Sequence, residues 1–206
     1  MIRTYTIGAV ALISGLLGVL GWLAFMPRSD DPFAPCRTAV VAGGIGSIGG
    51  PFELVNASGQ TVTDADIITM PSILYFGYTF CPDVCPLDSS RNAQAVEILE
   101  SRGIIAQPVF ISVDPRRDTP EVVGAFAGFF HPRMIGLTGS PEQVRAASQA
   151  FRTYYAAQDS GDEFYMVDHS THSYLVLPGH GAVEVFRHDM TAEQVAETAQ
   201  CFISNA

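Results

Sequence analysis

The stretch of sequence that decides the fold is residues 72–86, which read SILYFGYTFCPDVCP. It opens with an apolar run containing aromatic residues, which predicts a buried strand over residues 72–78. A helical pattern then runs from Pro86 to about residue 102, with proline at its first position and Gly103 just past its end. Cys81 and Cys85 are four residues apart, about one helical turn, so we expect both sulfur atoms on one face of the first turn of that helix. Such a pair either binds one soft metal ion or closes into a disulfide.

Strands and helices alternate on both sides of this stretch. Upstream, two short apolar runs flank Asn-Ala-Ser-Gly and indicate a hairpin. Downstream, Thr-Pro-Glu and Ser-Pro-Glu each predict the start of a helix. The expected strands cover residues 52–55, 61–63, 72–78, 109–113, 135–138, 173–177 and 183–187, and the expected helices cover residues 86–102, 120–130, 141–153 and 192–202. This order predicts an α/β protein with a thioredoxin-like fold, in which helices flank a central mixed sheet and the cysteines follow a central strand.

The N-terminal part of the chain has a different character. Residues 7–26 carry no charged side chain, and as a helix they would be about 30 Å long, the thickness of a bilayer's hydrocarbon core. A cleaved secretory signal is the main alternative, and a buried helix is another. A signal usually has an apolar region of about 7–15 residues that ends in small residues, whereas this run ends in Phe-Met-Pro-Arg. We therefore expect residues 1–26 to be a membrane anchor, residues 27–50 a flexible tether, and residues 51–206 one folded domain.

Charge and cysteine content bear on location and partners. The net charge of −10 argues against nucleic-acid binding, which requires basic patches. Arg3 and Arg28 flank the apolar run almost symmetrically, so loop charge gives little information on orientation. A short leader before a long apolar stretch usually sends the following domain outward. We expect a single-pass protein of the inner (cytoplasmic) membrane with its domain in the periplasm, and four cysteines are compatible with that compartment.

Two thiolates leave a metal ion undercoordinated, so a third ligand is expected among the five histidines. His131 ends a helix, where a capping or solvated role is expected. His180 and His188 lie at a turn tip and after the last strand, and both are expected to be exposed. His169 and His172 are three residues apart before the strand at 173–177, so they face opposite sides if both are extended. Spacing alone leaves these two nearly equal as candidates.

Three ordered blocks resemble a known family. Residues 76–86, FGYTFCPDVCP, closely resemble the signature of the Sco/SenC family of cytochrome c oxidase assembly proteins. FISVDPRRDTP at residues 110–120 and VDHS at residues 167–170 resemble its further conserved blocks, and the resemblance covers roughly residues 50–205.

This resemblance implies a membrane-anchored copper chaperone that delivers copper to the Cu(A) centre of cytochrome c oxidase subunit II, after receiving it from a periplasmic donor. By residue, it implies Cys81, Cys85 and His169 as the copper ligands. The chemistry agrees, because thiolates prefer Cu(I) while imidazole also binds Cu(II). Zinc would tolerate the same ligands.

Two alternatives share the expected fold. A thiol–disulfide oxidoreductase would use Cys81 and Cys85 as its redox pair to reduce the copper-ligating cysteines of the same subunit. The usual redox spacing, C-x-x-C, is absent, and redox chemistry does not need His169. A peroxidase needs a reactive cysteine with an arginine partner. The second cysteine one turn away argues against this peroxidase function, and so does the block that contains His169.

Four acidic residues and two further cysteines complete the candidates. Asp83 is a candidate helix cap, a polar contact of the sulfur atoms or a contact for a docking partner, and Asp118 is a candidate cap of the turn before Thr119-Pro120. Asp114 and Asp118 resemble the family's acidic pair. Asp168 is a candidate for orienting His169, although adjacent residues of a strand point to opposite sides. Whether Cys36 and Cys201 form a disulfide between the tether and the last helix stays open.

Overall fold

The computed structural model describes residues 14–19, 21–22, 31–37, 45–158 and 164–206. Most of the expected membrane anchor and part of the expected tether lie outside the described residues. Residues 14–19 and 21–22, inside the apolar run, are helical. In the part of the chain that is described, no helix combines the length and apolar character needed to cross a bilayer. The anchor therefore stays a prediction.

Seven strands in the described residues form one mixed sheet in the order β2-β1-β5-β4-β3-β8-β9. β3 is central, pairing parallel with β4 and antiparallel with β8. The strands are β1 (Glu53–Asn56), β2 (Thr61–Thr63), β3 (Ser72–Gly77), β4 (Gln107–Ser112), β5 (Ile135–Thr138), β8 (Ser173–Leu177) and β9 (Gly181–Phe186). The predicted thioredoxin-like arrangement, with parallel central strands and a terminal antiparallel hairpin, is confirmed.

The helices begin where the capping residues predicted them. Thr119, Ser140 and Thr191 each accept a hydrogen bond at their hydroxyl from a backbone N–H of the first turn. The helices are α2 (Asp64–Ile67), α3 (Val84–Ser101), α4 (Pro120–Phe130), α5 (Pro141–Ala150) and α6 (Ala192–Ser204). α3 begins two residues earlier than predicted, which places Pro86 inside its first turn. Proline is tolerated there because an N–H in the first turn has no partner within the helix.

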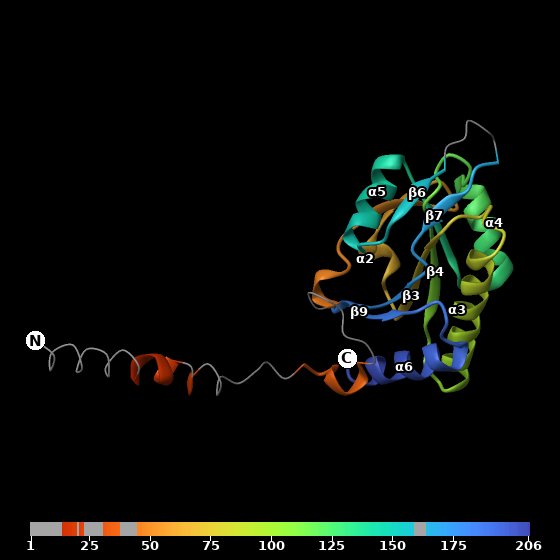
Figure 1. Cartoon of the computed structure of the whole chain (residues 1–206). Helices are drawn as coiled ribbons and strands as arrows, with labels where there is room; N and C mark the ends of the chain where they lie inside the picture. The colour runs from red at the N-terminus through yellow and green to blue at the C-terminus, as the bar shows by residue number, and fades with distance from the viewer. Residues whose placement is uncertain (1–13, 20, 23–30, 38–44, 159–163) are drawn as a thin grey trace, which may run out of the picture.

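Helices cover both faces of the sheet (Figure 1). On one face, Ile73 of β3 belongs to a buried cluster with α3 and α6, and Phe110 packs on Phe126 of α4 with ring centroids 4.5 Å apart. On the other face, Phe151, just after α5, packs against Phe76 and Tyr174 at 5.4 and 5.3 Å. β3 is therefore buried on both sides along its whole length, which gives the loop that follows it a rigid base.

A second, two-stranded sheet was not predicted. β6 (Tyr155–Ala157) pairs antiparallel with β7 (Val167–His169), and Tyr155 lies opposite His169. Each strand has only three residues, too few for an alternation pattern to be recognised in the sequence. His169 thus lies at the end of a strand of its own and does not enter β8.

A disulfide joins the N-terminal segment to the domain. Cys36 ends the 3-10 turn η1 (Ala34–Cys36) and is bonded to Cys201 of α6, with their Cα atoms 5.6 Å apart. Phe33 packs beside it on Phe202, with ring centroids 5.4 Å apart. The pairing that the sequence left open is therefore present. Figure 1 shows this attachment next to α6.

Candidate metal centre

The two cysteines lie at the carboxyl end of β3. Cys81 is in the turn before α3, and Cys85 is in its first turn, so the expectation that both lie in the helix is wrong for Cys81. The backbone N–H of Cys85 donates to the sulfur of Cys81 at 3.4 Å. This contact is the one a helix N-terminus offers to an anion, and here the sulfur takes the position of a capping group. Cys85 is completely buried, whereas Cys81 is 8% exposed.

His169 brings an imidazole nitrogen to this pair. Its Nε2 lies 3.3 Å from the sulfur of Cys85, and the three ligand atoms of Cys81, Cys85 and His169 all lie within 4.8 Å of one another. Nδ1 of His169 is 2.9 Å from the carbonyl oxygen of Ser170. Because a carbonyl only accepts, Nδ1 carries the hydrogen, and the lone pair of Nε2 faces the sulfur atoms. His172 is exposed and is not part of this cluster.

The two thiols differ in their electrostatic environment. A hydrogen bond from the Cys85 side chain lowers the pKa of Cys81 to about 4, aided by the backbone N–H groups of Asp83 and Cys85 and by His169. Burial, together with the neighbouring Cys81 sulfur, raises the pKa of Cys85. The metal-free pair therefore holds one thiolate, at the more exposed sulfur, and one thiol.

A buried carboxylate holds the turn that carries Cys81. Asp118, which is 0% exposed, accepts from the backbone N–H of Thr79 at 3.0 Å and from its hydroxyl at 2.6 Å. The Ser112 hydroxyl donates to the same carboxylate at 2.5 Å. Asp118 thus ties β4 to the turn before Cys81, and Thr119 caps the next helix as predicted. The expectation that the Asp118 side chain caps the turn before Thr119-Pro120 is wrong, because the donors to its carboxylate are Thr79 and Ser112.

Asp114 connects the same region to the segment before β7. The Tyr165 hydroxyl donates to Asp114 at 2.5 Å, and Arg117 forms an ion pair with Asp114 at 2.5 Å. The Arg117 guanidinium lies 3.7 Å from the centroid of the Tyr165 ring and 4.9 Å from that of the Phe80 ring. These contacts of Arg117 connect the segment before β7, which leads to His169, with the turn that contains Cys81.

Several smaller expectations had mixed outcomes. The Asp83 side chain makes no capping hydrogen bond, although Asp83 precedes α3. Asp168 accepts from the side chain of Gln158 at 3.0 and 3.1 Å, on the side of the strand away from His169. His131 is buried, and its Nδ1 accepts from a backbone N–H at 3.0 Å, so a solvated role is wrong. The other two histidines, His180 and His188, are exposed as expected.

Sequence reasoning missed two residues of β3 that touch the centre. The Tyr75 hydroxyl lies 3.7 Å from the sulfur of Cys85. Gly77 leaves room for that sulfur, because a Cβ atom at position 77 would lie 2.9 Å from it. Both were assigned to the sheet core, since a buried strand looks alike in sequence whether or not a functional group packs against it.

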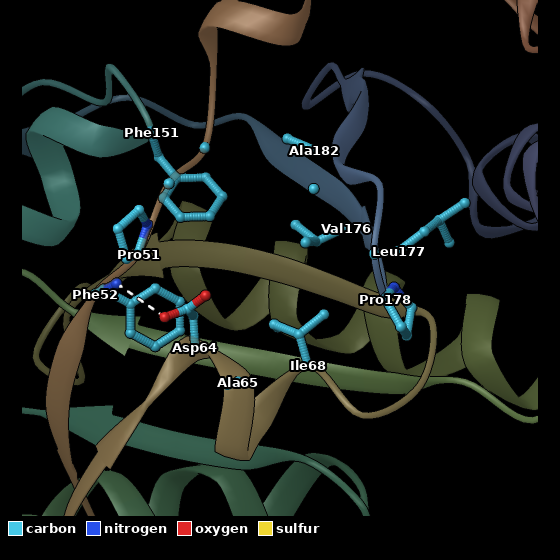
Figure 2. Close-up of a pocket in the computed structure, with 14 residues that line it drawn as sticks. Pro51, Phe52, Asp64, Ala65, Ile68, Phe151, Val176, Leu177, Pro178 and Ala182 are labelled. Atoms are coloured by element: carbon cyan, nitrogen blue, oxygen red, sulfur yellow. Dashed lines mark hydrogen bonds between the residues drawn. The ribbon is translucent and has the colours of Figure 1, made fainter.

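A separate cavity of about 370 Å³ lies near the first residue of β3, at the opposite end of the sheet. Figure 2 shows its mostly apolar lining, which includes Phe52, Phe151 and Val176. Asp64 contributes a carboxylate that accepts from the backbone N–H of Phe52 at 3.3 Å. Among the described residues that line it there is no cysteine or histidine, so it offers no ligands for a soft metal.

Comparison with known proteins agrees with the centre described above. The SCO1/SenC family model matches residues 42–204. The chain belongs to the SCO1/SenC family. Protein SenC of Rhodobacter capsulatus is 46% identical over 201 residues, which cover 98% of this chain and 90% of SenC. The human mitochondrial SCO2 homolog is 37% identical over 196 residues, which cover 92% of this chain and 73% of the human protein.

Solved structures of SCO1/SenC relatives share the fold. Arabidopsis thaliana ScoI with copper bound is 37% identical, has a TM-score of 0.71, and aligns over 76% of this chain and 99% of its own. Copper-bound yeast Sco1 is 32% identical, has a TM-score of 0.72, and aligns over 78% of this chain and 90% of its own. The Sco family is a family of cytochrome c oxidase assembly proteins.

Proposed function

We propose that this SCO1/SenC protein binds one copper ion through Cys81, Cys85 and His169 and delivers it to the Cu(A) site of cytochrome c oxidase subunit II. The observation that carries the proposal is the convergence of the three ligand atoms within 4.8 Å. The copper-bound relatives support copper as the cargo.

The ligand set fits a copper ion. Bonds from such an ion to nitrogen and sulfur are about 2.0–2.3 Å long, so its ligand atoms lie roughly 3.5–4 Å apart. Small shifts reach that geometry: the 3.3 Å separation of the Cys85 sulfur from Nε2 of His169 lengthens slightly, and the separations of up to 4.8 Å shorten. Thiolate sulfur holds Cu(I), and the imidazole nitrogen extends the range to Cu(II). Three protein ligands leave a coordination position open for an incoming group.

The proposed ligands differ in their exposure to solvent, and this difference suggests the order in which they would release the copper ion to an acceptor protein. Cys85 is completely buried, whereas Cys81 is slightly exposed and His169 is partly exposed. A ligand of the acceptor enters at the open position and displaces His169 or Cys81 first, while Cys85 holds the ion. The copper ion therefore passes between proteins without being released into water.

The test is a Cu(I) and a Cu(II) titration of the reduced full-length chain in detergent. The expected result is about one copper per parent chain, with Cys81→Ala, Cys85→Ala and His169→Ala each weakening binding of at least one copper oxidation state at least tenfold. His172→Ala is the matched control, because His172 is an exposed histidine three residues away, and it should bind copper like the parent. Parent-like binding of both copper states by His169→Ala would refute the ligand assignment.

A second function, reduction of the copper-ligating cysteines of subunit II, has its own supporting observation. Cys81 is the more exposed thiol and has a lowered pKa, as expected for an attacking thiolate, and Cys85 lies beside it to resolve a mixed disulfide. Stoichiometric reduction of an oxidised fragment of subunit II by the reduced protein, which leaves Cys81 and Cys85 joined in a disulfide, measures this activity. His169→Ala separates the two functions, since it should abolish copper delivery and leave disulfide reduction intact.

We also propose that residues 7–26 anchor the protein in the inner membrane with the domain in the periplasm, where a periplasmic donor supplies copper. The uncharged run of twenty residues supports the anchor. Protease added to spheroplasts should digest the domain. Protection of the domain from protease in intact spheroplasts would contradict this orientation.

A further inference from the structure

His169 lies on a small sheet that is separate from the main one. In the described part of the chain, β6 and β7 pair only with each other, and neither joins the seven-stranded sheet that contains β3 (Figure 1). A two-stranded ribbon has little stability of its own in water. The position of His169 relative to the cysteines therefore depends on the contacts that attach this ribbon to the rest of the domain.

The residues that lead to His169 alternate between the interior and the surface. Tyr165 and Val167 are buried, whereas Met166 and Asp168 are exposed. Side chains two residues apart in an extended chain point to the same side. Tyr165, Val167 and His169 thus form one row that faces the domain, and a shift of the first member of this row is passed along the strand to the last.

Tyr165 attaches this row to the domain through directional contacts. Its hydroxyl donates to the buried carboxylate of Asp114 at 2.5 Å. Arg117 forms an ion pair with the same carboxylate at 2.5 Å, and its guanidinium lies 3.7 Å from the centroid of the Tyr165 ring. Hydrogen bonds to a charged acceptor have a defined geometry, whereas Val167 belongs to the apolar cluster, whose attraction is non-directional. Tyr165 therefore determines where along the domain surface the ribbon is fixed.

Asp114 gives Tyr165 a rigid attachment point. The backbone N–H of Asp114 donates to the Ser112 hydroxyl at 3.0 Å, and its carbonyl oxygen accepts from the backbone N–H of Arg117 at 3.2 Å. Ser112 ends β4, which pairs with β3 along its whole length. Because Cys81 and Cys85 follow β3, the main sheet fixes the distance between the attachment point of Tyr165 and the two sulfur atoms.

We propose that Tyr165 is a positioning residue for the copper centre: its contacts with Asp114 and Arg117 hold β7 where His169 reaches the metal. This inference rests on the proposed copper ligands. Two thiolates suffice for the soft Cu(I) ion, whereas the imidazole is the ligand suited to Cu(II). Tyr165 therefore acts mainly on the binding of Cu(II).

The test is a double-mutant cycle on the reduced full-length chain in detergent, with Cu(II) and Cu(I) affinities measured anaerobically by chelator competition. Tyr165→Phe removes the hydroxyl and keeps the ring. A displacement of His169 by about 0.5 Å should lower the Cu(II) affinity about tenfold and leave the Cu(I) affinity within about threefold of the parent. In the His169→Ala background the same change should leave the Cu(II) affinity unaltered, because the group that Tyr165 positions is absent.

Electron paramagnetic resonance of the Cu(II) form gives a second readout. The parent should show hyperfine coupling to one nitrogen nucleus, and this coupling should weaken in Tyr165→Phe. Tyr154→Phe is the matched control, because Tyr154 is an exposed tyrosine that immediately precedes β6 of the same ribbon. This control should match the parent in both affinities and in its spectrum.

The outcomes separate the inference from the proposed function. A parent-like Cu(II) affinity in Tyr165→Phe, or the same loss in the parent and His169→Ala backgrounds, would overturn the inference and leave the ligands in place. If His169→Ala itself bound both copper states like the parent, the proposed function would fall.

A second variant covers the case in which Tyr165→Phe fails to fold, as judged by circular dichroism. Asp114→Asn then replaces it in the same cycle, because the amide loses the charge that holds both Tyr165 and Arg117. Its loss of Cu(II) affinity should again disappear in the His169→Ala background. A loss that persisted there would refute the positioning role.

Discussion

Gly77, the last residue of β3, leaves the space that the Cys85 sulfur occupies, so Gly77→Ala tests how tightly the centre is built. An added Cβ atom would lie 2.8 Å from Cε1 of Tyr75, 2.9 Å from the Cys85 sulfur and 3.1 Å from Cε2 of Phe110. All three side chains are at most 1% exposed, so none can turn into solvent. Ordinary contacts begin at 3.4 Å, and the sulfur must therefore move by about 0.5 Å.

Two effects of this substitution can be estimated. Overpacking of a buried position costs about 1–3 kcal/mol of the free energy of unfolding. Binding sites keep their full function only when their groups lie within about 0.5 Å of the correct positions. A sulfur displaced by that distance is at this limit, so copper affinity should fall roughly tenfold, or about 1.4 kcal/mol.

The assays are urea unfolding of the reduced full-length chain in detergent and competition for Cu(I) with a chelator. Gly128→Ala is the control, because Gly128 is exposed on α4 and has no atom within 4 Å of an added Cβ. That control should gain about 0.5–1 kcal/mol in stability, since alanine replaces glycine within a helix, and should bind copper like the parent. If Gly77→Ala matched the parent in both measurements, the close packing around Cys85 described above would be incorrect.

Three further outcomes follow from the structure. Replacing Cys36 and Cys201, which are 165 residues apart, by serine should lower the free energy of unfolding by roughly 5 kcal/mol from loop-closure entropy, and adding reductant should lower the parent's urea midpoint but not the variant's. In the reduced metal-free protein, mass spectrometry should find Cys81 alkylated before Cys85 at pH 6, with a rate nearly constant from pH 6 to 8, because its lowered pKa keeps it a thiolate there. A rate rising about tenfold per pH unit would indicate an ordinary thiol. Asp118→Asn should cost about 1–3 kcal/mol in urea unfolding, because a neutral amide cannot replace the carboxylate that accepts three hydrogen bonds, and an unchanged midpoint would be evidence against its role in holding the cysteine turn.

Local patterns were sufficient to predict the main sheet and the cysteine pair. Proline after serine or threonine marks a helix start through a capping hydrogen bond, and a run of apolar residues marks a buried strand. Cys81 and Cys85 were identified because two cysteines four residues apart follow an apolar strand and precede a helical pattern, at the carboxyl end of a strand where sites in α/β sheets lie. These features depend on residues close together in the chain.

The position of the third proposed ligand depends on residues distant in the chain, so spacing could not choose between His169 and His172. The choice is made by the short pairing of β6 with β7, which turns His169 toward the cysteines. The hydrogen bond between His188 and Asp88 joins residues 100 positions apart, and the residues around each of them in the sequence give no indication of it. Asp118 was expected to cap the turn before Thr119-Pro120, because sequence cannot distinguish an acidic residue that caps its own turn from one buried under a neighbouring turn.

The bond between Cys36 and Cys201 fixes where the N-terminal segment joins the domain relative to the proposed copper ligands. Cys201 lies near the end of α6, which packs beside α3, whereas Cys81 and Cys85 flank the opposite, amino-terminal end of α3 (Figure 1). Residues 31–36 therefore lie at the pole of the domain that is far from Cys81 and Cys85. A surface to which the domain is attached through this segment would lie on the side opposite the proposed copper ligands, which would leave those ligands facing a protein that approaches from the aqueous side.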